Sequence, residues 1–294
     1  MQRVIFLVTS LNGMHKPNFT KQLLQALQQG QRVVILAALI DFEATWTVRA
    51  FLNRLAQTEP QVKQIELLTL ADLFKDESGL TLTSDERNMP DLVAFDERLF
   101  VDGQEQVKRY LNVGHLVAER RQLDDETPMV LRQYQTDQLV QIDTYDLSGR
   151  VVGIEKIVDE VAQTSYVLNQ KGEAVLRFVR HERPIEKVYN LSATSAMLAT
   201  QFAEAKQAAA MMNMSKRERD RAAAEVADQT SIIKTTETYY GVLAYSNYQR
   251  FGQVYAFYES LLSRLMTSTT RLYVDLADNA ALAPQMPDQL IFNY

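Results

Sequence analysis

The sequence contains no cysteine among its 294 residues. Disulfide bonds, a thiol nucleophile and a zinc site built on thiolates are therefore excluded. Glycine and proline are also scarce, at 10 and 7 residues, which excludes a collagen-like or low-complexity chain. Apolar residues make up 46% of the sequence, enough for a large buried core. A chain of this length is expected to form about two domains.

An excess of positive charge is missing as well. Lysine and arginine total 31 against 37 acidic residues, and the net charge is −6. Proteins that bind nucleic acids usually carry a basic surface, so we expect no nucleic-acid partner. The histidines at 15, 115 and 181 lack metal-ligand spacing, and no G-x-S-x-G motif marks a serine nucleophile. We therefore expect no metal site and no cofactor, and we assign no catalytic residue.

Long hydrophobic runs are absent from the N-terminus. The run VIFLVT after Arg3 ends at Ser10, Asn12 and Gly13. It is too short for the core of a signal peptide or for a membrane span. We therefore expect a cytoplasmic protein without a transmembrane segment, either in the cytosol or peripheral at the inner face of the membrane.

The N-terminal part of the sequence alternates between buried strands and amphipathic helices. Apolar runs rich in β-branched residues predict strands at 3–9, 32–40 and 64–70. Between the first two runs, apolar residues at helical spacing predict a helix that Asn18 caps and Gly30 ends. A second helix is predicted before the third strand. This order of elements is typical of a doubly wound parallel α/β sheet.

A different pattern begins near residue 90, after a polar stretch. Asp or Asn close to Gly, within alternating apolar residues, recurs at Gly103, Gly149 and Gly172. Each of these sites predicts a β-hairpin. The repetition of the signal predicts an antiparallel β-meander.

Helical and α/β patterns return after Tyr189. Residues 192–228 are rich in alanine and other strong helix formers and contain no glycine or proline, which predicts a long Ala-rich helix. A further helix is predicted at 253–267, and strands at 271–276 and at the C-terminal LIFNY. The meander is therefore interpreted as an insertion into one α/β domain. The predicted domains are a Rossmann-like domain of residues 1–90 and 190–294 and an inserted β-meander domain of residues 91–189.

The loop that follows the first strand, residues 10–21, is the best candidate for a binding site. Ligands of parallel α/β sheets bind at the carboxyl ends of strands, where the N-terminus of a helix offers free N–H groups. The loop contains neither a dinucleotide fingerprint nor a P-loop. The alternative is an ordinary crossover loop in which the lysines are solvated and Asn18 only caps the helix. The expected ligand contacts are Asn12, Gly13, Lys16, Asn18 and Thr20, with Asp275 approaching from a later strand.

The order of elements resembles the N-terminal half of bacterial GT-B glycosyltransferases. The similarity lies in the first strand, the loop with Thr20-Lys21, the strand VVILAAL, the segment QIELLTLADLF and the hairpin-rich region from Val101 to Val179. The closing segment 270–294 is similar to late strands of the same half. Within that family, the chain is most similar to the poly(glycerol-phosphate) α-glucosyltransferases. These enzymes make and decorate wall teichoic acid or glycosylate surface adhesins.

The sequence departs from that family at several positions. The family's paired glycines after the first strand are reduced to Gly13, and its terminal histidine is replaced by Asn293. The Arg/Lys pair and the E-x7-E motif that hold the nucleotide sugar have no counterpart, because the chain ends where the donor lobe is expected to begin. Glu97 and Glu105 have the spacing of that motif but belong to the hairpin region, where we attribute it to chance.

The resemblance implies a function on the acceptor side of glycosylation. The first hypothesis is an acceptor-binding half of a glycosyltransferase, which takes a polymer or protein acceptor and becomes an enzyme only when a partner subunit supplies the donor lobe. The second is a non-enzymatic accessory or scaffold protein that binds a glycosyltransferase or its acceptor. An unrelated α/β domain that binds a small molecule is a third, weaker alternative.

Overall fold

The computed structural model describes residues 2–103, 105–123, 125–180, 187–191, 250–251 and 254–294. The chain divides into two compact units. The first comprises Met1–Leu73, Arg183–Glu186 and Phe251–Tyr294, and the second comprises Phe74–Glu182 and Lys187–Arg250. The predicted Ala-rich helix at 192–228 lies outside the described residues.

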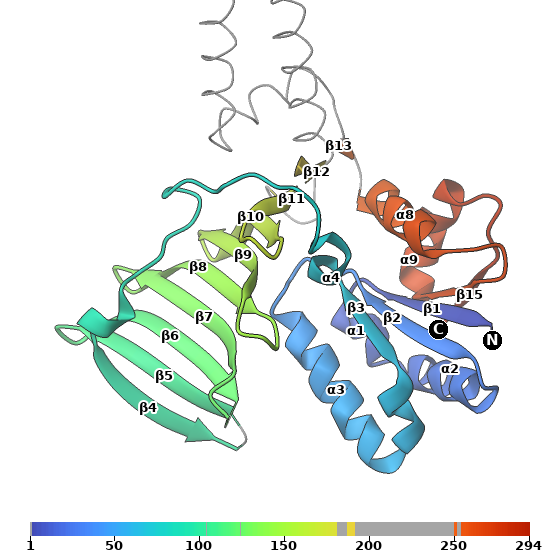
Figure 1. Ribbon diagram of the computed structural model, residues 1–294, viewed down its shortest axis with the longest axis horizontal. Helices are drawn as coiled ribbons and strands as arrows, with labels where there is room; N and C mark the ends of the chain where they lie inside the picture. The colour runs from blue at the N-terminus through green and yellow to red at the C-terminus, as the bar shows by residue number, and fades with distance from the viewer. Residues whose placement is uncertain (1, 104, 124, 181–186, 192–249, 252–253) are drawn as a thin grey trace, which may run out of the picture. The chain divides into compact units, whose positions relative to one another are not determined.

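The first unit contains a five-stranded parallel sheet with the order β15-β14-β1-β2-β3. From the central strand β1, the chain continues to β2 and β3 on one side, whereas β14 and β15 lie on the other (Figure 1). Ligands of open α/β sheets bind where the strand order reverses in this way. The reversal lies between β1 and β14. The strands are β1 Arg3–Val8, β2 Arg32–Ala37, β3 Glu66–Thr69, β14 Arg271–Val274 and β15 Ile291–Asn293.

Helices connect these strands and cover their apolar side chains. The core of the unit is mainly aliphatic and contains a group of aromatic rings: the ring centroids of Phe6 and Phe19 lie 5.7 Å apart, and Tyr273 stacks on Phe6 at 4.7 Å. Among the helices of the described residues, none is both long and apolar enough to cross a membrane. The helices are α1 Leu11–Met14, α2 Pro17–Gln28, α3 Ala44–Thr58, η1 Pro60–Gln64, α4 Leu70–Phe74, α8 Val254–Leu265, α9 Leu276–Leu282 and η3 Ala283–Gln285.

The start of α2 differs from the sequence-based prediction, and the short helices α1 and α9 were not predicted. Asn18 is not the N-cap: α2 begins at Pro17, whose fixed φ suits the first helical position, and Lys16 precedes it without a side-chain capping bond. Helices α1 and α9 replace the predicted loop and strand end. Each begins after a residue whose side chain accepts a backbone N–H, Ser10 for α1 and Asp275 for α9.

The second unit contains most of a ten-stranded sheet, in which β4 to β12 follow one another in chain order as antiparallel neighbours. The hairpins predicted at Gly103, Gly149 and Gly172 are confirmed. Other turns use non-glycine residues with positive φ, such as Thr136 and Asp159, so the glycine signal could not reveal them. The elements are η2 Leu92–Ala94, β4 Asp96–Asp102, β5 Glu105–Asn112, β6 His115–Leu123, β7 Pro128–Gln135, β8 Gln138–Tyr145, β9 Val151–Val158, β10 Val161–Leu168, β11 Ala174–Val179, β12 Lys187–Asn190 and β13 Arg250–Phe251.

Residues 74–90 lie in the second unit, whereas the boundary predicted from the sequence lies near residue 90. Leu80 forms a β-bridge with Ala174 through two backbone hydrogen bonds of 3.0 and 2.7 Å. Gly79 lies so close to this strand that a Cβ atom there would be 2.7 Å from the Ala174 carbonyl oxygen. The Tyr166 hydroxyl donates to the buried carboxylate of Glu86 at 3.3 Å. The segment is polar in sequence, but its residues nevertheless pack on the antiparallel sheet, which the composition did not indicate.

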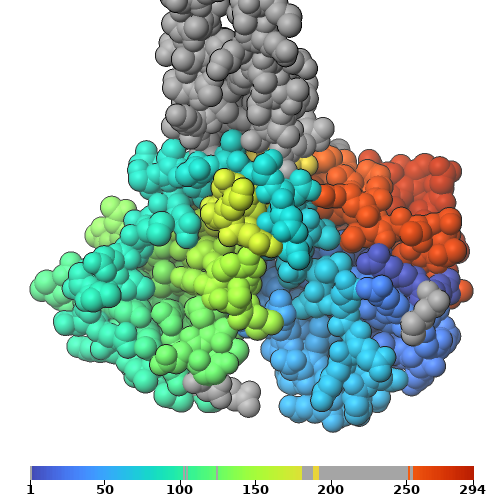
Figure 2. Space-filling model, viewed as in Figure 1, coloured from blue at the N-terminus to red at the C-terminus, as the bar shows by residue number. Residues whose placement is uncertain are grey.

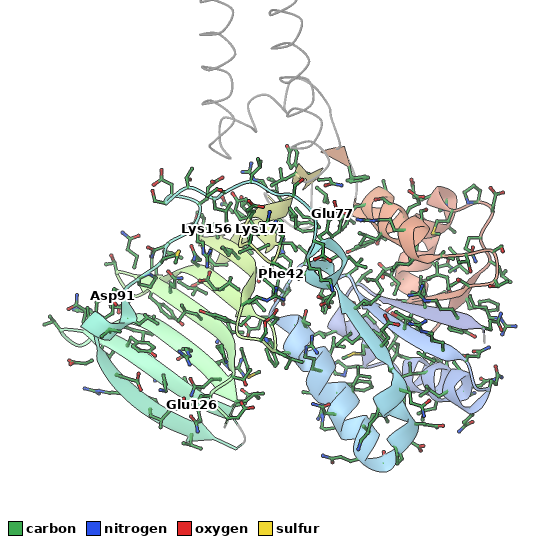
Figure 3. All side chains as sticks on the ribbon, viewed as in Figure 1. Phe42, Glu77, Asp91, Glu126, Lys156 and Lys171 are labelled. Carbon is green, nitrogen blue, oxygen red and sulfur yellow. The ribbon has the colours of Figure 1, made fainter. Side chains whose placement is uncertain are left out.

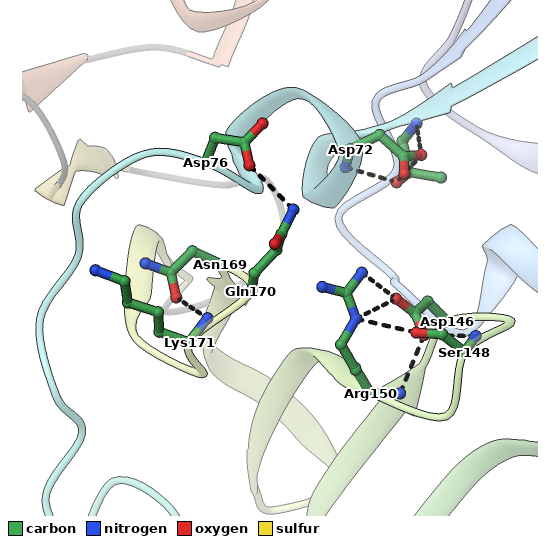
Figure 4. Close-up of polar contacts among 9 residues, drawn as sticks. Asp72, Asp76, Asp146, Ser148, Arg150, Asn169, Gln170 and Lys171 are labelled. Atoms are coloured by element: carbon green, nitrogen blue, oxygen red, sulfur yellow. Dashed lines mark hydrogen bonds and ion pairs between the residues drawn. The ribbon is translucent and has the colours of Figure 1, made fainter.

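Asp146 organises the turn between β8 and β9. Its carboxylate accepts hydrogen bonds from the N–H groups of Ser148 at 2.8 Å and Arg150 at 3.0 Å, and from the Arg150 guanidinium at 2.7 Å (Figure 4). Partial burial would raise the pKa of Asp146, but the hydrogen bonds from Ser148 and Arg150 outweigh it and lower that pKa. Gly149 completes the turn with a φ of 78°.

Replacing Gly149 with valine is expected to lower the free energy of unfolding by about 2 kcal/mol, because the left-handed region is costly for L-residues and most costly for β-branched ones. Lack of space is not the cause, since a Cβ atom would lie 3.6 Å from Pro128, an ordinary contact. Urea denaturation measures the effect. Gly149→Asn is the control, because asparagine tolerates this conformation. An equal loss in both variants would contradict the conformational explanation.

Candidate functional site

The carboxyl ends of β1 and β14 converge on one buried carboxylate. The two strands are parallel neighbours, with Leu7 opposite Val274. Asp275 directly follows β14 and is only 4% exposed. Its Oδ1 accepts a hydrogen bond from the N–H of Ala277 at 2.8 Å, which caps α9, and another from Lys16 Nζ at 2.5 Å. A helix N-terminus and a lysine from the start of α2 therefore share the same acceptor atom.

Gly13 packs against the other oxygen of the same carboxylate. A Cβ atom at position 13 would overlap Asp275 Oδ2. The Ser10 hydroxyl accepts the N–H of Gly13 at 3.4 Å and so fixes the short helix α1 in this position. The glycine is required here for space. We call Gly13, Lys16 and Asp275 the Asp275 cluster.

The Asp275 cluster presents a positive charge at the surface. The side chain of Lys16 is 43% exposed, whereas that of Asp275 is 6% exposed. An ammonium group has three N–H donors, so donors remain for a ligand after the bond to Asp275 is made. In the part of the chain that the structure describes, no three His, Asp or Glu side chains are grouped to hold a metal ion. The arrangement is therefore suited to binding an anionic or hydroxyl-bearing group.

The structure brings together three of the six residues that the sequence indicated. Asn12 and Asn18 are exposed and Thr20 is half-buried. Their side chains make no hydrogen bond to another described residue. On α2, the buried face belongs to Phe19 and its neighbours one turn later, which directs positions 18 and 20 away from the core.

Asp278, in the first turn of α9, is a second carboxylate near the site and was not among the predicted site residues. It accepts hydrogen bonds from the hydroxyls of Thr9 and Tyr255, the latter at 2.9 Å. Burial, together with the hydrogen bond and charge of Asp278, raises the pKa of Tyr255 to about 12. Tyr294 donates its hydroxyl to a carbonyl of β1 at 2.6 Å, and burial and the charges of Asp275 and Asp278 raise its pKa. Acidic residues three positions apart are a start signal for a helix, which could have revealed α9.

A separate polar cluster lies on the antiparallel sheet of the second unit. The buried carboxylate of Asp143 accepts hydrogen bonds from the side-chain amides of Gln141 at 2.7 Å and Gln133 at 3.0 Å. Gln141 also accepts the backbone N–H of Asn88 at 2.9 Å and a bond from Lys156 at 3.3 Å (Lys156 is labelled in Figure 3). Burial raises the pKa of Asp143 to about 6, although the glutamine hydrogen bonds and nearby cations act in the opposite direction.

Comparison with known proteins gives a fold and no sequence family. No protein-family model matches the sequence, and no curated protein matches it. The structure is nevertheless similar to the pneumococcal O-GlcNAc transferase GtfA in complex with UDP and GlcNAc, with a TM-score of 0.50 and 8% identity. The match covers 99% of this chain and 47% of that chain. The chain has the fold of about half of a glycosyltransferase.

Two further solved structures match over a similar extent. One is the Glycosylation Associate Protein (Gap123) complex from Streptococcus agalactiae, with a TM-score of 0.54, 9% identity and coverage of 99% of this chain and 51% of that chain. The other is the GtfA/B complex, with a TM-score of 0.50, 8% identity and coverage of 100% of this chain and 48% of that chain. This chain therefore spans about half the length of each of these three chains.

Proposed function

We propose that this chain is the acceptor-side half of a glycosyltransferase, with the antiparallel sheet as an insertion in a Rossmann-like GT-B lobe. The observation that carries the proposal is that nearly the whole chain matches about half of an O-GlcNAc transferase. In GT-B enzymes one lobe holds the acceptor and the other holds the nucleotide sugar. The partner of this chain would be a subunit that carries the donor lobe. The acceptor would be wall teichoic acid or a surface protein, modified in the cytoplasm.

The Asp275 cluster is the proposed acceptor site. It lies where the strand order reverses, which is the preferred ligand position in open α/β sheets. Asp275 holds Lys16 in place and leaves the ammonium group partly exposed. Pro17 has no N–H, and the N–H of Phe19 donates to the carbonyl oxygen of Lys16 at 3.0 Å, so the N–H of Asn18 is the backbone donor that the first turn of α2 would offer beside Lys16. Asn12, Asn18 and Thr20 would supply uncharged hydrogen bonds to a polymer or protein acceptor.

Replacing Lys16 and Asn18 together with alanine is expected to weaken acceptor binding at least about tenfold, because a charge-assisted hydrogen bond contributes about 1.5–3 kcal/mol. Isothermal titration calorimetry with a glycerol-phosphate polymer, or with a candidate acceptor protein, measures the affinity. Lys63→Ala is a matched control, since Lys63 is exposed and lies in the first unit, in η1. This control should bind like the wild type.

Thermal unfolding of the same variants separates binding from stability. Lys16→Ala leaves the buried carboxylate of Asp275 without its cation, so some loss of stability is expected. Lys16→Arg keeps the charge and should retain both stability and binding. A loss of stability with unchanged acceptor affinity would leave Lys16 a structural role only, and the proposed site would have to be abandoned.

A non-enzymatic accessory protein is the second candidate, favoured by the match to a Glycosylation Associate Protein complex. The two candidates predict different results when the chain is mixed with a glycosyltransferase and an acceptor. If this chain is an acceptor-side half, sugar transfer requires both proteins. If it is an accessory protein, the transferase is active alone and this chain changes only its stability or its recruitment of acceptor.

A further inference from the structure

Strand β4 is an open edge of the ten-stranded sheet. Within the described residues it pairs only with β5, over its whole length and without a bulge. Three consecutive apolar side chains of β4 are exposed: Leu99 at 53%, Phe100 at 46% and Val101 at 69%. Natural proteins usually protect such edges with proline, lysine, bulges or a covering segment. β4 contains no proline and no lysine, and Figures 1 and 2 show it at the open margin of the unit.

We propose that β4 pairs with β4 of a second copy of this chain, as antiparallel strands related by a two-fold axis. The strand has the sequence DERLFVD. When Phe100 lies opposite Phe100, Leu99 falls opposite Val101, and Arg98 falls opposite position 102, which is aspartate in the sequence. Aromatic, apolar and oppositely charged residues are then matched across the two strands, the pairs that stabilise antiparallel sheets.

Alternative registers are less favourable. An axis at Leu99 would place the aspartates of positions 96 and 102 opposite each other, and an axis at Arg98 would place two arginines together. Like charges directly opposite each other destabilise a sheet. When a two-fold axis relates the two strands, a given residue lies on the same face of the sheet in both copies. Residues directly opposite each other must also lie on the same face, so a register whose axis falls between two residues is excluded. The register centred on Phe100 is the self-complementary one.

Arg98 supplies an independent argument for a second copy. Its neighbour across the sheet is Arg109, another cation, and Arg109 donates to Glu119 at 2.9 Å. Arg98 itself is exposed and makes no ion pair or hydrogen bond with any described residue. Pairing of two copies would provide the opposite charge that this side chain lacks. Because a two-fold pairing uses the same edge of both copies, the assembly closes as a dimer and does not grow into a fibre.

The absence of cysteine permits a direct test on the full chain. Phe100→Cys places the only thiols of two copies directly opposite each other, at a separation compatible with a disulfide. Mild oxidation of this variant is expected to give a covalent dimer on a non-reducing gel. Val93→Cys is the control, since Val93 is 94% exposed but precedes β4, and it should remain monomeric. Circular dichroism under reducing conditions verifies that both variants are folded. Equal cross-linking of the two would indicate random collision and overturn the proposal.

A charge exchange tests the register without a cross-link. Arg98→Asp and Asp102→Arg, each alone, place like charges opposite each other and should weaken the dimer at least about tenfold in analytical ultracentrifugation. The double variant restores opposite charges and should restore the dimer. A wild-type chain that stays monomeric at high micromolar concentration, a ladder of larger oligomers, or a double variant no better than the singles would each overturn the proposal. This interface does not depend on the proposed function.

Discussion

Replacing Gly13 with valine is expected to lower the free energy of unfolding of the first unit by about 3 kcal/mol, the upper range for overpacking combined with a disturbed buried ion pair. A side chain at this position would overlap the carboxylate of Asp275. That carboxylate caps α9 and holds Lys16, so one substitution disturbs a helix start and an ion pair together. Urea denaturation followed by circular dichroism measures the loss. Acceptor binding should fall with it, because Lys16 loses its support.

Two further variants determine whether the overlap is the cause. Asn12→Val introduces the same side chain at the neighbouring exposed position of α1 and should cost much less. A double-mutant cycle then compares Gly13→Ala in the wild type with Gly13→Ala in an Asp275→Ala background. The cost should be clearly smaller once the carboxylate is gone. An unchanged cost would show that Gly13 is required for a reason other than its contact with Asp275.

Replacing Asp143 with asparagine is expected to remove a pH-dependent contribution to stability of about 2–3 kcal/mol. Burial raises the pKa of Asp143 from 3.8 to about 6. The folded state therefore binds the proton more tightly than the unfolded state does. The stabilisation is complete below about pH 4, the unfolded pKa, and is lost as the pH rises through about 6. Between those values, the wild type should become less stable relative to Asp143→Asn as the pH increases.

Urea denaturation at intervals between pH 4 and pH 7.5 gives the two stability curves whose difference tests this sign. Asp159→Asn is the matched control, because it removes the same charge from an exposed turn of the same unit. If the curves of the wild type and Asp143→Asn run parallel, the carboxyl of Asp143 does not titrate in this range. The raised pKa would then be wrong.

Much of the fold could be predicted from local pattern. Continuous apolar runs such as RVIFLV and RVVILA are the signature of strands buried on both faces, and they form β1 and β2. The spacing of Phe19, Leu23 and Ala26 predicts the buried face of α2, because one face of a helix repeats every three to four residues. The glycine turns at 103, 149 and 172 likewise revealed hairpins. Each of these signals lies within a few consecutive residues.

The candidate site could be predicted only in part. The sequence indicated the loop after the first strand and the aspartate after a late strand, but it did not show which side chains meet. Lys16 and Asp275 are 259 positions apart, and their ion pair exists because β1 and β14 are parallel neighbours. Asp278 of α9 likewise accepts hydrogen bonds from Thr9, which follows β1, and from Tyr255 of α8. No short-range sequence pattern links these three positions.

The sequence by itself determined the kinds of the longer helices and strands, because burial and turn geometry act on neighbouring residues and produce a periodic pattern. Only the tertiary structure decided that Gly13 is needed for space and that residues 74–90 pack on the antiparallel sheet. These outcomes depend on contacts between distant segments. Such contacts follow from strand order and packing, which a local pattern does not contain.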